Sequence, residues 1–255
     1  VIRGPIDAQI LPAPRLVLRD VTLGDVVSTG GTVKELQAEL SLGGLMRGDI
    51  EATGVTLIHP QMRLVLDSAG EITLPTGSGE PVDFSIARLE VQDGALDLLD
   101  RASDRTLSLT DLGLRGEARS LVGPFRLDGE VEAAGARFGL RSTLGKLGAE
   151  GTGRLRLILD GRTSPFGVDL DGALGFTGHK PQYDGRVTLS RKGTDALEAW
   201  QLSGQVRAGP DGAIAENLNL ALGGAAMPAQ LSGSARLSLG RAIGLDAVLN
   251  AKSLD

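Results

Sequence analysis

The sequence predicts an all-β protein: a long antiparallel, strongly twisted sheet curled into an open, taco-like groove, with one or two short helices at most. Apolar residues recur at every second position through most of the chain, which is the period of a strand with one buried face. Glycine, with 37 residues, is about twice as frequent as in ordinary proteins. Gly, Asp and Pro separate the alternating runs, as turns require, and helical periodicity is scarce.

The first strands are expected at residues 15–23 and 50–66. Their alternating apolar positions are Leu16, Leu18, Val21 and Leu23 in the first run, and Ile50, Ala52, Val55, Leu57, Met62, Leu64 and Leu66 in the second. His59 precedes Pro60 and is expected at the end of a strand.

Residues 32–42 fit two different elements. Thr32 and Glu35 have the spacing of a helix-capping box, and the apolar residues that follow it partly keep helical spacing. The same segment alternates at Leu36, Ala38, Leu40 and Leu42, and this strand is the favoured interpretation.

Residues 85–100 contain Asp93-Gly94 between two alternating segments. This dipeptide in such a setting is the strongest short signal for a β-hairpin, because both residues tolerate the backbone of a type I′ turn. The sequence therefore predicts two short strands here, with Leu89 and Val91 on one and Leu96 and Leu98 on the other.

Further strands are expected wherever the alternation returns. The positions concerned are Leu107, Leu109, Leu112 and Leu114; Leu155, Leu157 and Leu159; Val168, Leu170, Leu174 and Phe176; Leu218, Leu220 and Leu222; and Ala235, Leu237 and Leu239. Residues 194–200 are suited to one or two helical turns. We expect a single elongated β-groove domain over residues 1–255, with a soft internal boundary near residues 76–82, and a longer native chain.

Composition excludes several classes of function. The net charge of −6 and the 3% of aromatic residues argue against nucleic-acid binding, because that function needs a basic surface and aromatic rings that stack on bases. The lack of Cys excludes disulfide frameworks and thiolate metal sites. No stretch approaches the ~20 apolar residues of a membrane helix, and no signal peptide is visible.

The sequence offers no catalytic constellation, and we expect no enzyme, no cofactor and no metal. His59 and His179 are the two histidines, and both are expected to be solvated residues without a catalytic role. The carboxylate pairs Asp97 with Asp100 and Asp169 with Asp171 are the candidates for acid–base work, and we interpret them as parts of a solubilising outer face.

A Leu-rich sheet face of this length must be covered by something. A β-sandwich core usually contains a buried Trp, and a transmembrane barrel needs Trp and Tyr girdles, whereas this chain has one Trp and one Tyr. A curled sheet with a smooth aliphatic interior instead suits acyl chains, since apolar contact worth ~25 cal/mol per Å² needs no directional groups. Glycine permits the bending that such a sheet requires.

The residues expected to contact acyl chains are ten apolar residues of the alternating face. They are Leu64, Leu66, Leu89, Val91, Leu155, Leu157, Leu159, Leu218, Leu220 and Leu222. Their alternative role is an ordinary core packed against protein. A register slip of one residue would also turn them to the other face of the sheet.

The stretch "IRGPIDAQILPAPRLVLRDVTLGD" at residues 2–25 resembles the N-terminal region of the AsmA family. The matching residues are Gly4, Ile6, Leu11, Pro12, Pro14, Leu16, Leu18, Asp20, Val21 and Leu23. Residues 40–67 are similar to the family's next block, at Leu40, Leu42, Leu45, Gly48, Ile50, Ile58 and Pro60. Residues 86–100 and 245–255 resemble its recurrent strand elements, and the order of these degenerate motifs is their specific feature.

The resemblance implies a relative of the bridge-like lipid-transfer proteins that projects a β-groove into the periplasm. It implies an anchor helix in the inner membrane before Val1 and more groove after Asp255. The implied role is phospholipid transport to the outer membrane, or support of outer-membrane assembly, with phospholipid as cargo and outer-membrane or periplasmic proteins as further partners.

Two other interpretations stay open. The first is a non-enzymatic outer-membrane assembly factor whose sheet binds protein partners rather than lipid, either within the groove or by strand addition at an edge. The second is a secreted β-solenoid enzyme that acts on a polysaccharide. That enzyme would require a cluster of carboxylates in space.

Overall fold

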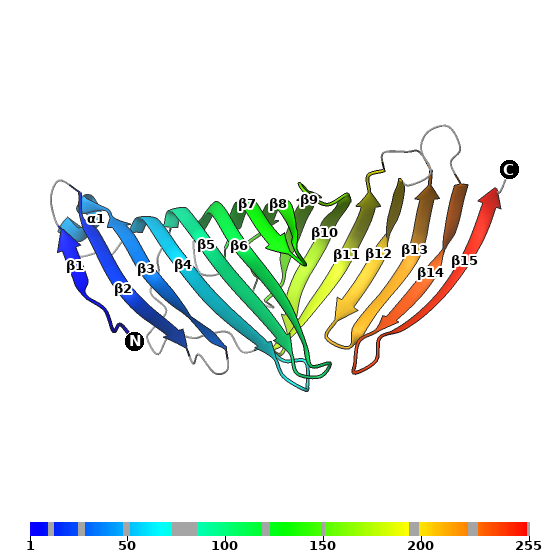
Figure 1. Cartoon of the computed structure of the whole chain (residues 1–255), viewed down its shortest axis with the longest axis horizontal. Helices are drawn as coiled ribbons and strands as arrows, with labels where there is room; N and C mark the ends of the chain where they lie inside the picture. The colour runs from blue at the N-terminus through cyan, green and yellow to red at the C-terminus, as the bar shows by residue number, and fades with distance from the viewer. Residues whose placement is uncertain are drawn as a thin grey trace.

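The computed structural model describes residues 1–9, 13–24, 29–47, 52–72, 86–118, 123–148, 151–193, 199–223 and 229–253. Within these ranges fifteen strands form one sheet whose order follows the chain from β1 to β15, and the sheet does not close on itself. Figure 1 shows it as a long, bent layer, with β2–β6 in front, β7–β9 behind and β10–β15 rising at the other end. The all-β prediction is confirmed.

The strands are longest near the middle of the first half of the sheet. Their bounds are β1 (Ile6–Gln9), β2 (Arg15–Gly24), β3 (Gly30–Leu40), β4 (Ala52–Leu66), β5 (Ile86–Asp100), β6 (Arg105–Ala118), β7 (Phe125–Ala133), β8 (Ala136–Leu144), β9 (Gly153–Gly161), β10 (Phe166–Thr177), β11 (Lys180–Arg191), β12 (Trp200–Gly209), β13 (Gly212–Leu222), β14 (Ala229–Ser238) and β15 (Gly244–Ser253).

The described residues contain one helix, α1 (Leu42–Arg47). Ser41 precedes it as an N-cap, and its Oγ accepts a hydrogen bond from the Gly44 amide at 3.1 Å. The favoured strand over residues 32–40 is confirmed as part of β3, but Leu42 begins the helix instead of extending that strand. Helical turns were predicted over residues 194–200: residues 194–198 lie outside the described residues, and Trp200 begins β12 instead. Residues 76–82, where a soft boundary was predicted, also lie outside the described residues.

The predicted hairpin at Asp93-Gly94 is wrong. β5 runs through both residues, and its neighbour β4 pairs with it in parallel, whereas every other neighbouring pair of described strands is antiparallel. Asp93 adopts a left-handed backbone with φ of 51°, and the register with β6 shifts on both sides of Gly94. The dipeptide therefore forms a bulge within a strand, where the same backbone conformation is required as in a hairpin turn.

His59 likewise lies inside a strand and not at its end. It is in the middle of β4, with φ of 49°. Comparable left-handed residues interrupt other strands, namely Asp20 of β2, Asp111 of β6 and Asn217 of β13. Asp, Asn and His are the non-glycine residues most often found in this conformation, so the sequence supplies tolerant residues at each bulge.

One row of directly paired residues crosses the whole sheet and is apolar at every strand. From β1 to β15 it reads Ile6, Leu18, Leu36, Leu57, Val91, Leu114, Gly129, Leu140, Leu159, Val168, Leu189, Leu202, Leu220, Leu231 and Ala251. Directly paired residues point to the same side of a sheet. We call the side that presents this row the aliphatic face, and the opposite side the polar face.

The described core is thin because the sheet is a single layer. The buried hydrophobic residues are Val21, Val33, Val65, Leu112, Ala118, Val131 and Leu218, and of these Val33 is fully buried. Three of them directly follow a left-handed residue, at Asp20, Asp111 and Asn217. At these three positions, the side chain that follows the left-handed residue is buried.

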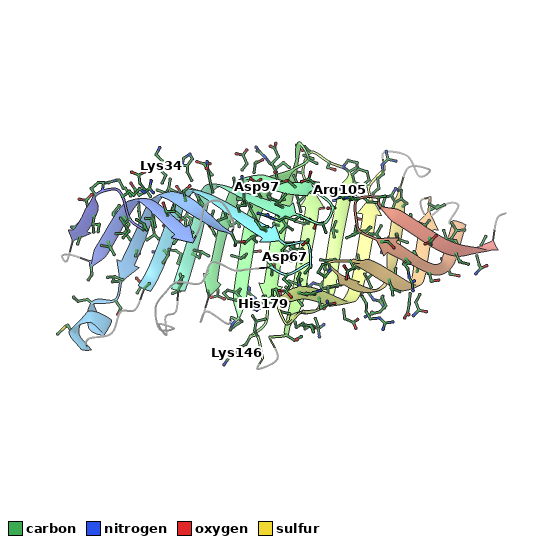
Figure 2. The ribbon with its side chains drawn as sticks, turned by 90° about the horizontal axis from the view of Figure 1, so that it is seen from below. Lys34, Asp67, Asp97, Arg105, Lys146 and His179 are labelled. Atoms are coloured by element: carbon green, nitrogen blue, oxygen red, sulfur yellow. The ribbon has the colours of Figure 1, made fainter. Side chains whose placement is uncertain are left out.

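A short segment after β4 joins parts of the sheet that are distant in the chain. We call residues 67–72 the clip. The Ile72 amide donates a hydrogen bond to the His179 carbonyl at 2.9 Å, in the turn between β10 and β11. Gly70 packs on Pro210 in the turn between β12 and β13, so closely that a Cβ on Gly70 would lie 2.4 Å from the Pro210 Cβ. Figure 2 shows Asp67 and His179 between the long margins marked by Lys34 and Lys146.

Candidate functional site

The aliphatic face is the largest candidate surface on the molecule. Its pattern continues on both sides of the central row, with for example Leu64 opposite Leu98 and Leu157 opposite Leu170. In the described strands, the residues that alternate in phase with this row are apolar, with few exceptions. The exceptions are Ser142, Tyr183 and Arg191 and the strand ends Asp100, Arg105 and Ser253. A surface of this kind offers dispersion and hydrophobic contact without directional groups.

All ten residues predicted to contact acyl chains lie on the aliphatic face. Eight are half-buried, Leu218 is buried with 8% exposure, and Leu222 at the end of β13 is 37% exposed. They come from β4, β5, β9 and β13, which the topology places in one continuous sheet. The structure therefore brings all ten together on one side of that sheet.

Nothing in the described chain forms a second layer over this face. The close approaches between strands are those between sheet neighbours, from β1 with β2 to β14 with β15. The accessible surface is 15801 Å² for a 26.4 kDa chain, whereas a compact monomer of that mass exposes roughly 10600 Å². The excess is expected for a single-layer sheet that leaves both of its faces accessible to solvent.

Glycines show which way the sheet bends. On the aliphatic face, a Cβ at Gly116 would lie 2.0 Å from the Arg126 carbonyl oxygen, and one at Gly233 would lie 1.9 Å from the Val248 oxygen. Such contacts mean that the neighbouring strand is rotated toward this side. A Cβ at Gly113, on the polar face of β6, would meet no described atom within 4 Å. The sheet therefore curls toward the aliphatic face.

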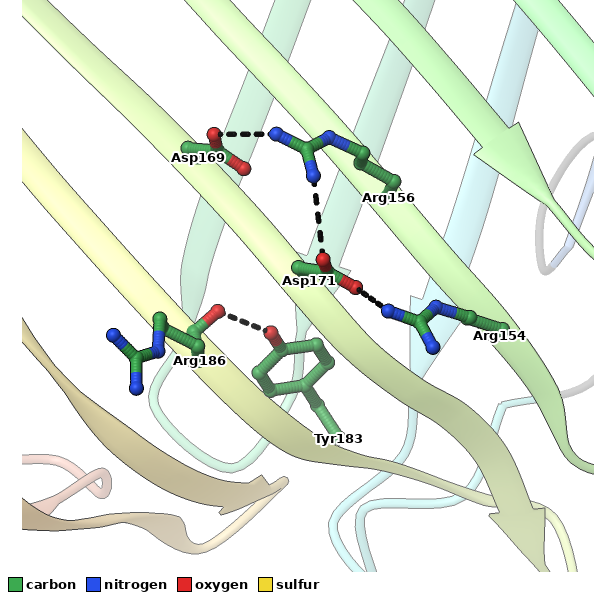
Figure 3. Close-up of polar contacts among 6 residues, drawn as sticks. All are labelled: Arg154, Arg156, Asp169, Asp171, Tyr183 and Arg186. Atoms are coloured by element: carbon green, nitrogen blue, oxygen red, sulfur yellow. Dashed lines mark hydrogen bonds and ion pairs between the residues drawn. The ribbon is translucent and has the colours of Figure 1, made fainter.

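The polar face carries cross-strand ion pairs instead. Arg156 lies 3.1 Å from Asp169 and 3.2 Å from Asp171, and Arg154 lies 2.8 Å from Asp171 (Figure 3). A shallow hollow of about 600 Å³ lies beside these residues, and the charged side chains of Arg154, Asp171, Asp184 and Arg186 are among those that line it. This pattern confirms that Asp169 and Asp171 share a face, and it explains their presence as a solvated network. Each such exposed pair adds at most about 1 kcal/mol.

The other predicted carboxylate pair is not brought together as a site. Asp97 accepts a hydrogen bond from Ser108 Oγ at 2.6 Å on the polar face. Asp100 accepts one from the Ala102 amide at 3.0 Å and so stabilises the turn after β5. Each carboxylate has a separate structural role.

The two histidines are also accounted for by structure. His59 Nε2 lies 3.7 Å from Asp93 Oδ2, which links the left-handed residues of β4 and β5, and the His59 side chain is half exposed. His179 lies in the β10–β11 turn, and its carbonyl holds the clip. Neither is near a nucleophile with the spacing of a hydrolytic triad in the described residues.

The described part of the chain contains neither a metal cluster nor a membrane helix. No group of three or more His, Asp or Glu side chains among these residues is arranged to hold a metal ion. No described helix has the length and hydropathy needed to cross a membrane.

Aromatic residues were not among the predicted site residues, yet every described one lies on the aliphatic face. They are Phe125, Phe138, Phe166, Phe176, Tyr183 and Trp200, all from β7–β12. Tyr183 Oη donates to the Arg186 carbonyl at 2.7 Å, and partial burial raises the pKa of the phenol. Their alternating positions would have revealed this placement, because each is in phase with neighbouring leucines.

Comparison of the chain with protein-family models, with curated proteins and with solved structures finds no match. Of the motif positions that resemble the AsmA family, Leu11, Pro12, Gly48, Ile50, Leu254 and Asp255 lie outside the described residues. The others that fall within strands lie in β1–β5 and, for residues 245–253, in β15; Asp20 has a left-handed backbone, and Pro60 follows the left-handed His59.

Proposed function

We propose that the aliphatic face binds the acyl chains of phospholipids and that the protein is a lipid-binding segment of a lipid-transfer groove. The observation that carries the proposal is the row of fifteen paired apolar residues, which crosses the sheet without one polar interruption. An acyl chain can contact such a surface at any point along it. A single enclosed pocket would not need an apolar path across every strand.

The energetics are favourable for a ligand of this kind. Burial of about sixteen methylene groups would gain roughly 13 kcal/mol before the cost of immobilising the lipid. The curl toward the aliphatic face lets neighbouring strands contact one chain from more than one side. Charged side chains at the polar face keep the outside of the sheet in water.

The cellular role is proposed from the resemblance to the AsmA family. In this proposal the groove belongs to a periplasmic protein anchored in the inner membrane, and it supports phospholipid transport to the outer membrane or the assembly of that membrane. No step of bond making or breaking is assigned to any residue.

Extraction of co-purified lipid tests the proposal. The protein is purified without added lipid, extracted with organic solvent, and the extract is quantified by mass spectrometry against protein concentration. At least one phospholipid per chain is the expected result. A lipid-free, monodisperse protein that also fails to take up phospholipid from vesicles would overturn the proposal.

A second candidate is favoured by the exposed edge at β15. Leu245 is 69% exposed, Val248 66% and Leu249 44%, and β15 pairs with β14 alone among the described strands. A ten-residue edge without proline accepts an additional strand readily. In this alternative the protein is an assembly factor that binds protein partners.

The two candidates differ in the ligand that the purified protein binds. A synthetic peptide with the sequence of β14 would bind at the β15 edge if strand addition is the function, with calorimetry as the measurement. The lipid-transfer proposal expects phospholipid in the extract and no measurable affinity for this peptide. Peptide affinity together with a lipid-free extract would favour the assembly factor.

A further inference from the structure

The aromatic residues are unevenly placed on the aliphatic face. All six described aromatics lie in β7–β12, and the described strands β1–β6 contribute none. Two of them form a ring contact: the centroids of Phe166 and Trp200 are 6.2 Å apart with an interplanar angle of 52°. Tilted aromatic pairs of this kind are favoured by the charge distribution of the two rings.

This pair lies at the border of the face and not in its interior. Phe166 begins β10, Trp200 begins β12, and Arg191 at the end of β11 is paired in register with both. We call these three residues the lip. Phe166 is 46% exposed, and Trp200 is half-buried.

Polarity changes sharply across the lip. Inward, the next residues of the face are Val168, Leu189 and Leu202, all apolar. On the other side of the lip, at the ends of the strands, the residues are charged. Lys192 lies 2.6 Å from Asp160, and Arg162 lies 3.7 Å from the same carboxylate. The lip is thus a boundary between hydrocarbon-like and hydrated surroundings, where Trp is favoured because its ring is apolar and its N–H is polar.

We propose that the lip holds the junction between the headgroup and the acyl chain of a bound phospholipid, an inference that rests on the proposed function. The headgroup lies beside Arg191 and the hydrated strand ends, and the chain runs inward along β11 and β12. One acyl chain spans roughly 15 Å, half of the ~30 Å hydrocarbon core of a bilayer. At ~3.3 Å per strand residue this length reaches from Trp200 to about Gly204.

Trp200 is the single tryptophan of the chain, so its fluorescence reports this position alone. The protein is loaded with phosphatidylcholine brominated either near the headgroup or near the terminal methyl, and bound lipid is measured separately by co-elution. At equal loading, bromine near the headgroup is expected to quench Trp200 at least twofold more strongly. Equal quenching, or stronger quenching by the terminal label, overturns the placement at the lip while the proposed function stands.

A matched control moves the tryptophan to the opposite end of β10, which is separated from β12 by β11. Phe176 lies on the aliphatic face near the end of β10, so W200F/F176W keeps one tryptophan and the aromatic content. With a headgroup at the lip, this variant is expected to show weak quenching by both labels. Quenching equal to that of Trp200 would mean that lipid has no fixed position, which contradicts the inference. If neither brominated lipid co-elutes with the wild-type protein or with the variant, the proposed function itself is overturned.

Discussion

Single residues with a left-handed backbone set the phase of the apolar pattern. Asp20, His59, Asp93, Asp111 and Asn217 each lie inside a strand with φ near 50°. The alternation on the aliphatic face steps by three residues at each of them, as from Leu18 to Val21 and from Leu109 to Leu112. The bulge restores the leucines after it to the same side, so one face stays apolar along strands of up to fifteen residues.

Asp93 tests this role of the backbone. Asp93→Val places a β-branched side chain in the left-handed region and is expected to lower the free energy of unfolding by about 1–2 kcal/mol. Asp93→Gly can adopt the left-handed conformation without strain, so its free energy of unfolding is expected to remain within ~0.5 kcal/mol of that of the wild type. Urea unfolding measures both. Equal losses in the two variants would show that the side chain, and not the backbone, is responsible.

Leu157 and Ile158 test the two faces with adjacent residues. Leu157 is on the aliphatic face opposite Leu170, whereas Ile158 is on the polar face opposite Asp169. Leu157→Asp is expected to weaken phospholipid binding at least about tenfold, because a carboxylate would lose water under an acyl chain. Ile158→Asp is expected to change it less than about threefold, because that side chain lies away from the lipid.

Binding is measured by lipid co-elution, with circular dichroism to establish that both variants fold. A loss of binding in Ile158→Asp as large as that in Leu157→Asp would contradict the assignment of the lipid to one face. Unchanged binding in Leu157→Asp with a normal spectrum would contradict it as well.

Among the elements, β6 contains a matched pair of glycines. Gly116→Ala adds a methyl group 2.0 Å from the Arg126 carbonyl oxygen, and is expected to cost about 1–3 kcal/mol of stability. Gly113→Ala adds a methyl group into open space on the other face, and is expected to stabilise by about 0.4–1 kcal/mol through the unfolded chain. Thermal unfolding of both variants tests the direction of curl, and equal effects would be incompatible with a bend toward the aliphatic face.

The clip should make stability depend on pH in acid. Hydrogen bonds from the Glu71 and Ala69 amides, at 2.9 and 2.8 Å, lower the pKa of Asp67, with Lys180 adding to the effect. A lowered folded-state pKa contributes stability above the unfolded value of 3.8, and this contribution is lost as pH falls through the folded pKa.

Comparison with Asp67→Asn isolates this contribution. Wild type is expected to be the more stable protein near neutral pH, and the difference is expected to shrink below about pH 4 and to vanish once Asp67 is protonated in the folded state. Urea midpoints across the acid range provide the measurement. A difference that persists unchanged at low pH would mean that the Asp67 charge does not stabilise the clip.

Sequence patterns predicted most strands because the apolar period is strong. Residues 155–159, 168–176 and 218–222 lie in strands as expected. The prediction of a hairpin at Asp93-Gly94 was wrong because a bulge and a tight turn both require a residue with a left-handed backbone. Local sequence therefore cannot distinguish the two structures. The parallel pairing of β4 with β5 decides between the two, and it depends on contacts between distant segments.

For the molecule as a whole, the candidate surface was predictable and the details of its shape were not. Alternation places the ten predicted residues on one face. The direction of curl depends on how neighbouring strands rotate at Gly116 and Gly233, and the clip depends on contacts between Gly70 and Pro210. These are non-local packing relations that no single segment encodes. The lip was missed for a similar reason, because Phe166 and Trp200 meet across two strand spacings.

The proposed function depends above all on acyl chains lying along the aliphatic face of this open sheet. Photo-crosslinking with a phospholipid that carries a photoactivatable group in its acyl chain, followed by peptide mapping, detects their position. We expect labels at alternating residues such as Leu157, Leu159, Leu170 and Leu202, and none at the polar-face neighbours Ile158 and Thr188. Equal labelling of both faces, or no labelling above that of unfolded protein, would contradict the placement of lipid on this face.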